Sequence, residues 1–287
     1  MESFEGRLAV VTGGGTGMGR ELVIQLASEG CSVATCDVNP DTVAETQQRA
    51  EKEAPAGTRV TTHICDVSQE DQVVKFRDEV VAQHQTDHVN LVFNNAGVGG
   101  GGSFVTGERS EWDRTFGICW GGVYHCSRAF VPLLIASDDG YLVNTSSVNG
   151  FWACLGPGIA HTAYSTAKFA VKGFSEALVT DFRLNAPHVK VAVVMPGHVG
   201  TGIVANTMSV LADDESLAES MREVSDAFAA KAPVSARQAA TIILDGVRND
   251  EWRILVGDDA RALDDAVRAD PSAAYGADGL ALRSITG

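Results

Sequence analysis

The sequence predicts an α/β fold in which one parallel β-sheet of about seven strands is covered by helices on both faces. Short apolar runs alternate with segments of helical periodicity from residue 7 to about residue 257, and no linker interrupts them. The first apolar run leads directly into a glycine-rich turn and then into a helix. Polar motifs follow several strands, at the edge where sheets of this kind bind ligands. We therefore expect a single domain of 287 residues.

The predicted strands are short, mostly continuous apolar runs, as expected for strands that are buried on both faces. They cover residues 8–11, 32–36, 60–64, 91–93, 141–145, 189–195 and 252–256. Helical spacing of apolar residues predicts helices after the glycine turn and over residues 41–52, 69–84, 109–135 and 163–184. Parallel strands joined through such helices form right-handed crossovers, which place helices on both faces of the sheet.

The segment TGGGTGMG at residues 12–19 is typical of a turn that binds a dinucleotide. Glycines let the backbone approach a pyrophosphate, and the following helix N-terminus offers free N–H groups to the phosphates. The strand–turn–helix context favours this interpretation over a merely flexible loop. Asp37 ends the next strand, about 20 residues on, where a carboxylate accepts ribose hydroxyls and repels a 2′-phosphate. This favours NAD over NADP, and Arg20 is the residue that could weaken the preference.

Tyr164 and Lys168 lie four residues apart in a predicted helix, so their side chains share one face. An ammonium about 4–6 Å from a phenol lowers its pKa by roughly 1–3 units. The phenol would then exchange protons closer to neutral pH, where acid–base catalysis is efficient. The alternative for the pair alone is an ordinary solvated contact.

Taken together, the motifs resemble those of the short-chain dehydrogenase/reductase family, of the short single-domain type, over residues 6–257. The matching stretches are Thr12-Gly13-x-x-x-Gly17-x-Gly19, Asp66-Val67, Asn94-Asn95-Ala96-Gly97, Asn144-Thr145-Ser146-Ser147, Tyr164-x-x-x-Lys168 and Pro196-Gly197-x-Val199-x-Thr201. The resemblance implies a Rossmann-like doubly wound sheet in residues 1–260, a substrate lid at about 200–233 and a C-terminal tail at 261–287. It also implies a homodimer or homotetramer.

The resemblance further implies the roles of individual residues. Ser147 would hold the substrate oxygen, Tyr164 would transfer the proton, and Lys168 would bind the nicotinamide ribose and lower the tyrosine pKa. The residues expected to bind NAD are Gly13, Thr16, Gly17, Met18, Gly19, Asp37, Asp66, Val67, Asn94, Ala96, Gly97, Tyr164, Lys168, Pro196, Gly197, Val199 and Thr201.

Two departures from the family pattern are visible. Ser147 and Tyr164 are 17 residues apart, more than is usual in the family, and the apolar loop at residues 151–159 accounts for the difference. We interpret this loop as a wall of a hydrophobic substrate pocket, or as an excursion that packs on its own chain or on a partner subunit. Cys119 occupies the position of the family's catalytic Asn. Because Gly117, Gly121 and Gly122 surround it, we expect glycines to supply the irregularity in the helix that Asn usually aids.

The predicted function is NAD-dependent interconversion of a secondary alcohol and a ketone on an apolar substrate. A steroid or hydroxyacyl dehydrogenase, or a cofactor-binding regulatory protein with weak turnover, are the alternatives. The lid region has apolar residues at helical spacing, which either line a pocket or form an amphipathic surface helix. They are Met208, Leu211, Leu217, Met221, Val224 and Phe228. His161 and His198 receive no role.

Composition excludes several other classes. The net charge is −15 and the isoelectric point is about 4.8, which argues against binding to nucleic acid or to an anionic membrane. The six cysteines form neither a C-x-x-C pair nor a zinc-like cluster, so we expect no metal. Residues 1–7 show neither the basic region nor the apolar stretch of a signal peptide, and the sequence contains no run of about 18 apolar residues. These features predict a cytoplasmic protein.

Overall fold

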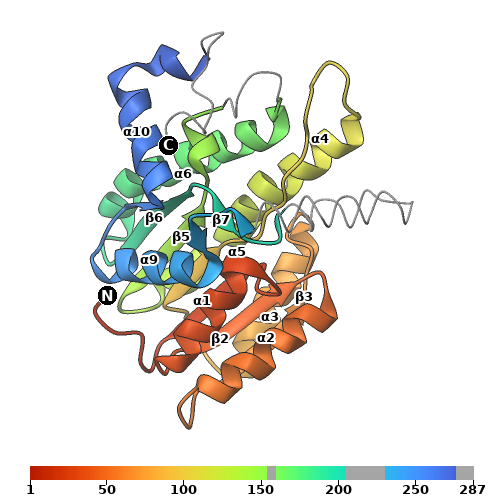
Figure 1. Ribbon diagram of the computed structural model, residues 1–287. Helices are drawn as coiled ribbons and strands as arrows, with labels where there is room; N and C mark the ends of the chain where they lie inside the picture. Colours follow the sequence, from red (N-terminus) through yellow and green to blue (C-terminus); the bar gives the residue numbers. More distant parts are fainter. Residues whose placement is uncertain (154–159, 204–229, 276–287) are drawn as a thin grey trace.

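The computed structural model describes residues 1–153, 160–203 and 230–275. Its centre is a sheet of seven parallel strands in the order β3-β2-β1-β4-β5-β6-β9 (Figure 1). The strands are β1 Leu8–Thr12, β2 Ser32–Asp37, β3 Val60–Ile64, β4 Leu91–Asn94, β5 Gly140–Thr145, β6 Val189–Pro196 and β9 Arg253–Val256. The predicted single-domain α/β fold with a doubly wound, seven-stranded parallel sheet is therefore confirmed.

The order in which strands are added to the sheet reverses at β1, so that β1 and β4 flank the topological switch point. It runs from β1 outward to β2 and β3, then returns to place β4 on the other side of β1 before continuing to β5, β6 and β9. Ala9 of β1 pairs with Val33 of β2 on one side and with Leu91 of β4 on the other. Loops that leave β1 and β4 therefore diverge at the carboxyl edge, and the crevice between them is the ligand position of this topology.

The helices are α1 Gly17–Ser28, α2 Pro40–Glu53, α3 Glu70–His84, α4 Arg109–Phe116, α5 Gly122–Ile135, α6 Thr162–Asn185, α9 Ala236–Arg248 and α10 Asp258–Ala269. A π-helical turn, Gly117–Gly121, joins α4 to α5, and 3₁₀ turns occupy Val148–Gly150 and Pro271–Tyr275. A second small sheet pairs β7 Val199–Gly200 with β8 Val234–Ser235. The sequence patterns did not predict this small sheet.

Both faces of the central sheet are buried by helices (Figure 1). Leu22 and Leu26 of α1 pack with Ile243 of α9 against one face. Phe76 of α3 and Phe130 of α5 pack against the other face. The inner strands therefore need apolar side chains in both directions, which is why mostly continuous apolar runs, rather than alternating ones, predicted them.

The segment after β9 packs back onto the site side of the sheet. Ala260 and Leu263 of α10 form a buried cluster with Val148 and Trp152. The helix thus crosses residue 260, where we expected a tail to begin. The lid residues Met208, Leu211, Leu217, Met221, Val224 and Phe228 lie outside the described residues, as does the 154–159 part of the apolar loop. Among the described residues, no helix combines the length and apolar character that crossing a membrane requires.

Phe130 offers a test of this packing. Its side chain is fully buried and makes an edge-to-face contact with Phe76, the ring centroids lying 5.4 Å apart. We expect Phe130→Ala to lower the free energy of unfolding by about 3–5 kcal/mol, because it leaves a cavity beneath the sheet. Urea denaturation measures this. The same truncation at Phe104, whose side chain is 76% exposed, should change stability by no more than about 0.5 kcal/mol. Equal losses in the two variants would contradict the assignment of the core.

Candidate active site

A cavity opens at the carboxyl edge of the sheet, between the loops that follow β1, β4, β5 and β6. It gathers most of the residues that the sequence singled out. They are Gly13, Thr16, Gly17, Met18, Asp37, Asp66, Val67, Ala96, Gly97, Ser147, Tyr164, Lys168, Pro196, Gly197, Val199 and Thr201. The residues come from strand ends that are far apart in the chain. The parallel sheet brings them together because all of its strands end on the same side.

Two of the predicted cofactor residues, Gly19 and Asn94, do not line this cavity. Gly19 is buried beneath the glycine turn, where a Cβ would lie 2.1 Å from the Gly13 carbonyl oxygen. It therefore permits the close packing of the turn and does not face the ligand. The Asn94 side chain points into the protein and donates to Asn144 Oδ1 at 2.8 Å and to Ser127 Oγ at 3.1 Å.

The neighbouring Asn95, which we did not single out, lines the cavity instead. Its Nδ2 donates to the Thr12 carbonyl oxygen at 3.1 Å and to the Gly13 carbonyl oxygen at 3.4 Å, so it ties the loop after β4 to the end of β1. The Asn-Asn-Ala-Gly motif indicated that this loop borders the cavity. It did not indicate which of the two asparagine side chains points toward the cavity.

Asp37 is positioned by the glycine turn and by the loop after β2. Its Oδ2 accepts from the Gly15 N–H at 2.9 Å, and its Oδ1 accepts from the Asn39 N–H at 3.2 Å. The carboxylate lies at the end of β2 and borders the cavity. A ligand reaching this part of the cavity therefore meets a fixed negative charge.

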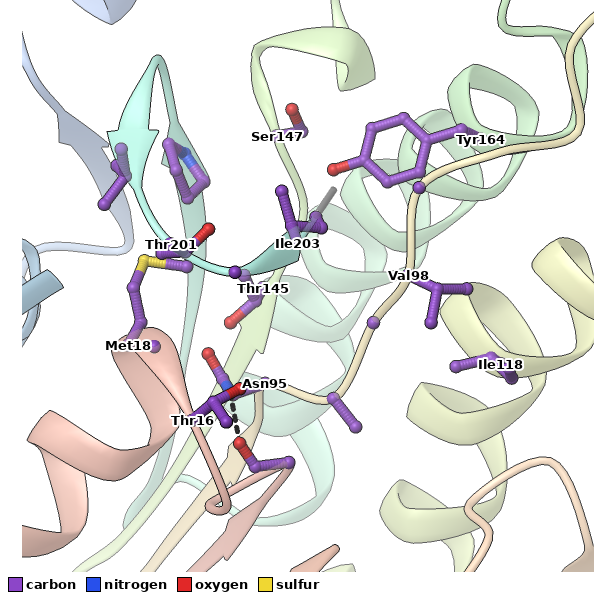
Figure 2. A pocket seen from close by; sticks show the side chains of 18 of the residues that line it. Thr16, Met18, Asn95, Val98, Ile118, Thr145, Ser147, Tyr164, Thr201 and Ile203 are labelled. Carbon is purple, nitrogen blue, oxygen red and sulfur yellow. Dashed lines mark hydrogen bonds between the residues drawn. The ribbon is translucent and has the colours of Figure 1, made fainter. Parts of the chain in front are cut away.

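Ser147 and Tyr164 face each other across the deep end of the cavity. The hydroxyl of Tyr164 points toward Ser147, as Figure 2 shows. Ser147 follows β5, is 7% exposed, and its Oγ accepts from the Asn149 N–H at 3.2 Å. The two hydroxyls therefore point into the same part of the cavity, where both could hydrogen-bond to one substrate oxygen.

Lys168 lies one helical turn after Tyr164. Its Nζ is 5.4 Å from the centre of the tyrosine ring and donates to the Thr145 carbonyl oxygen at 2.9 Å. The side chain is only 3% exposed, and burial lowers the pKa of its ammonium group. The predicted juxtaposition of phenol and ammonium on one helix face is therefore present.

The expected direction of the tyrosine pKa was wrong for this structure. Burial raises the pKa of Tyr164 above its usual value, and a hydrogen bond with Ser147 only partly opposes that rise. Desolvation disfavours the phenolate more than the surrounding groups stabilise it. The phenol is accordingly protonated at neutral pH, which is the state that donates a proton.

The first turn of α6, which carries Tyr164, is held by a glycine segment after β4. The N–H groups of Thr162 and Ala163 donate to the carbonyl oxygens of Gly102 and Gly101, each at 3.1 Å. Glu111 Oε1 in turn accepts from the Gly101 N–H at 3.1 Å. These bonds satisfy two of the free N–H groups at the helix start and fix where the helix begins.

Cys119 lies in the π-helical turn between α4 and α5. The irregular helix expected from its glycine neighbours is present at Gly117–Gly121. The thiol is fully buried and donates to the Val98 carbonyl oxygen at 3.2 Å. π-Helical turns are frequent at functional sites because they redirect side chains within a helix.

A buried carboxylate from the end of the chain also reaches the site. Asp259, in the first turn of α10, accepts from the His198 N–H at 2.6 Å through Oδ2 and borders the cavity. It is 5% exposed. Sequence reasoning missed this residue because its partner lies 61 positions earlier. The sequence did offer one signal, because Asp259 lies just after the last strand and therefore at the carboxyl edge of the sheet.

Apolar side chains also line the cavity that contains Tyr164. They include Val98, Ile118 and Ile203 (Figure 2). Polar groups from Glu111 and Arg114 also reach the lining. In the part of the chain that the structure describes, no three His, Cys, Asp or Glu side chains are grouped so as to hold a metal ion.

Comparison with known proteins identifies the family. The family model for short chain dehydrogenases matches residues 7–211. SadH of Mycobacterium tuberculosis, a protein assigned as an oxidoreductase, is 36% identical over 264 residues, covering 92% of this chain and 91% of SadH. The chain therefore belongs to the short-chain dehydrogenase/reductase family, and it is an oxidoreductase of that family.

Two solved structures share this fold. A short-chain dehydrogenase/reductase from Burkholderia phymatum in complex with NAD superposes with a TM-score of 0.78 at 29% identity, covering 94% of this chain and 92% of that one. A metagenomic short-chain oxidoreductase in complex with NADP gives a TM-score of 0.60 at 28% identity, covering 78% and 92% respectively. The family thus includes similar proteins that hold either nucleotide.

Cys119 provides a test of the irregular helix. We expect Cys119→Ala to change kcat by no more than several-fold, because a thiol is a weak donor and the π-helical turn remains. Cys119→Asn should also be active. Initial rates measure both effects, and Cys126→Ala, an equal truncation of a buried cysteine on α5, is the matched control. A hundredfold loss in a folded Cys119→Ala enzyme, with the control unaffected, would show that the thiol itself is needed.

Proposed function

We propose that the protein uses NAD to interconvert a secondary alcohol and a ketone on an apolar substrate. The observation that carries the proposal is that Ser147, Tyr164 and Lys168 line the same cavity as Asp37. Ser147 follows β5 and Asp37 ends β2, two strands that lie on opposite sides of β1 and β4. The residues present fit a dinucleotide. The glycine turn borders the cavity, where the start of α1 would offer N–H groups to the phosphates, and Asp37 borders it at the end of β2, where its carboxylate would accept from ribose hydroxyls.

The chain's own groups account for the proton and the orientation of the substrate. Ser147 Oγ and Tyr164 Oη hold the substrate oxygen between them, and Tyr164 gives up its proton to that oxygen as a ketone is reduced. The reverse reaction returns the proton to the phenolate. Lys168, with its ammonium group near the tyrosine ring, stabilises the negative charge that forms there. A bound nicotinamide would supply or accept the hydride, that is, two electrons together with the hydrogen on the carbinol carbon.

The cofactor residues in this proposal are those that border the cavity, and Asp37 distinguishes the two nucleotides. The carboxylate accepts from the ribose hydroxyls of NAD and repels the 2′-phosphate of NADP. An apolar substrate is supported by the side chains of Val98, Ile118 and Ile203, which line the same cavity as the tyrosine. We also expect a homodimer or homotetramer in the cytoplasm, as the family resemblance and the composition suggest.

The alternatives differ in substrate or in turnover. A steroid or hydroxyacyl dehydrogenase would use the same side chains. A regulatory protein with weak turnover is favoured by Cys119 in place of Asn. An assay of NADH oxidation over a panel of ketones, steroids and β-ketoacyl thioesters tests the proposal directly. Turnover of apolar ketones supports it, and nucleotide binding without turnover of any of these substrates would favour the regulatory alternative.

Tyr164 provides the sharpest test of the chemistry. Tyr164→Phe should keep NADH binding and lose nearly all turnover, because the ring packing survives while the transferable proton is gone. Removal of such a general acid costs roughly 10²–10⁴-fold in rate. Lys168→Ala should weaken both binding and turnover. Nucleotide fluorescence measures the first property and initial rates the second. Substantial activity in Tyr164→Phe would show that the catalytic assignment is mistaken.

Cofactor preference tests the role of Asp37. A hydrogen bond to a charged group contributes about 1.5–3 kcal/mol, so kcat/KM with NADH should exceed that with NADPH by more than about tenfold. Parallel initial-rate measurements with the two nucleotides and one ketone give the ratio. Equal values would mean that Asp37 does not select the cofactor.

A further inference from the structure

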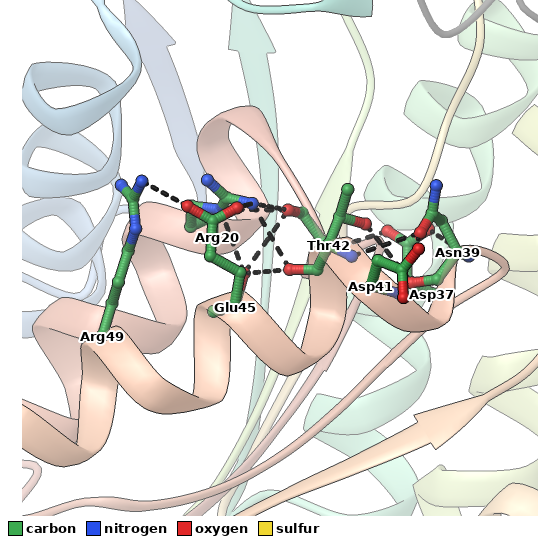
Figure 3. Close-up of polar contacts among 9 residues, drawn as sticks. Arg20, Asp37, Asn39, Asp41, Thr42, Glu45 and Arg49 are labelled. Carbon is green, nitrogen blue, oxygen red and sulfur yellow. Dashed lines mark hydrogen bonds and ion pairs between the residues drawn. The ribbon is translucent and has the colours of Figure 1, made fainter.

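The side chain of Arg20 is hydrogen-bonded to the backbone of the glycine turn. Arg20 lies in the first turns of α1, and its side chain is only 14% exposed. Its Nε and Nη2 both donate to the Gly15 carbonyl oxygen, at 3.0 and 2.6 Å. The same group donates to Thr46 Oγ1 at 3.0 Å and to the Thr42 carbonyl oxygen at 3.3 Å, both on α2 (Figure 3). The guanidinium therefore fastens the turn to α2.

The charge of Arg20 is neutralised within the protein. Glu45 on α2 accepts from Arg20 Nη2 at 2.9 Å and also pairs with Arg49, one turn further along the helix (Figure 3). Hydrogen bonding to Arg49 and the charge of Arg20 both lower the pKa of Glu45, so the carboxylate stays ionised at neutral pH. Arg20 is thus not a free cation waiting for a phosphate.

Gly15 connects Arg20 to Asp37, the carboxylate proposed to accept from the ribose hydroxyls. Arg20 holds the Gly15 carbonyl oxygen, and the Gly15 N–H donates to Asp37 Oδ2 at 2.9 Å. The fit leaves no space for a side chain, because a Cβ on Gly15 would lie 2.7 Å from Asp37 Oδ2 and 2.5 Å from Thr42 Oγ1. The orientation of the Asp37 carboxylate therefore depends on the backbone at Gly15, and that backbone depends on Arg20.

We propose that Arg20 is a positioning residue for cofactor selection, which holds Gly15 so that Asp37 meets the ribose in one fixed orientation, while Glu45 neutralises its charge. The inference deepens the proposed function and rests on it, since it takes Asp37 as the group that selects NAD. It gives Arg20 the opposite effect from a direct contact with a 2′-phosphate. In the proposed role, Arg20 favours NAD. In a direct contact, it would favour NADP.

The test compares dissociation constants for NADH and NADPH, measured by nucleotide fluorescence without any substrate. Arg20→Met should weaken NADH binding while NADPH binding changes little, so the preference for NADH falls by about threefold to tenfold, which lies in the lower part of the range for coupled neighbours. The matched control is Arg49→Met. It removes the same charge from the same network, but Arg49 has no hydrogen bond to Gly15 among the described residues, and the control should keep the preference. Thermal unfolding confirms that each variant is folded.

A double-mutant cycle shows whether Arg20 acts through Asp37. Asp37→Asn should itself lower the preference, and adding Arg20→Met to Asp37→Asn should lower it no further. Full additivity of the two effects would overturn the proposal. So would a higher preference for NADH in Arg20→Met, which is the signature of a direct contact with the 2′-phosphate. Equal weakening of both nucleotides would reduce Arg20 to a structural role and would also overturn it.

Glu45→Gln keeps the proposal testable if Arg20→Met does not fold. This variant keeps the size of the side chain but leaves the charge of Arg20 uncompensated, so NADPH should bind several-fold more tightly while NADH binding is unchanged. No change in either constant would contradict the role given to Glu45. If wild-type protein binds the two nucleotides equally, selection by Asp37 fails and the inference fails with it. If wild-type protein prefers NADH and Arg20→Met retains that preference, only the inference fails.

Discussion

The site depends on a buried network of side-chain hydrogen bonds among β4, β5, α5 and α6. Asn94 at the end of β4 donates to Asn144 of β5 at 2.8 Å, and Asn144 donates to Ser175 of α6 at 3.0 Å. A further bond joins Asn94 to Ser127 of α5. All four side chains are almost fully buried, so a broken bond would leave polar atoms without water. The network joins β4 and β5 of the sheet to α6, the helix that carries the reactive side chains.

The same burial decides the ionisation of the reactive groups. Lys168 and Tyr164 lie where water is scarce, and desolvation acts on both by disfavouring their charged forms. The Thr145 carbonyl oxygen, which accepts from Lys168, partly replaces the lost water. Sequence spacing could predict that these groups are neighbours. It could not predict the direction of the tyrosine pKa, because that direction depends on how deeply both side chains are enclosed.

Most of the fold could be predicted because most strands of the central sheet are largely apolar runs and several loops at the carboxyl edge carry a recognisable motif. Most of the site followed for the same reason, since motif positions map directly onto strand ends. The exceptions share a cause. Asn94 and Asn95 are adjacent, but their side chains leave the strand end in different directions, and a motif does not show which one faces the ligand. The roles of Asp259 and Arg20 depend on contacts between segments that are far apart in the sequence, and only the folded chain brings these segments together.

The glycine segment after β4 has a consequence for how this site tolerates change. It holds the start of α6 through the carbonyl oxygens of Gly101 and Gly102, which are groups that every residue type possesses. The alignment therefore depends on the number of residues along this segment, together with glycine at position 101, where φ is +63° and a Cβ would lie 2.2 Å from the Ala163 Cβ. Successive residues of an α-helix are rotated by about 100° and advance by about 1.5 Å. A single-residue deletion here, if it moved the cap by one position, would swing the Tyr164 ring out of the cavity while leaving every side chain of the site unaltered.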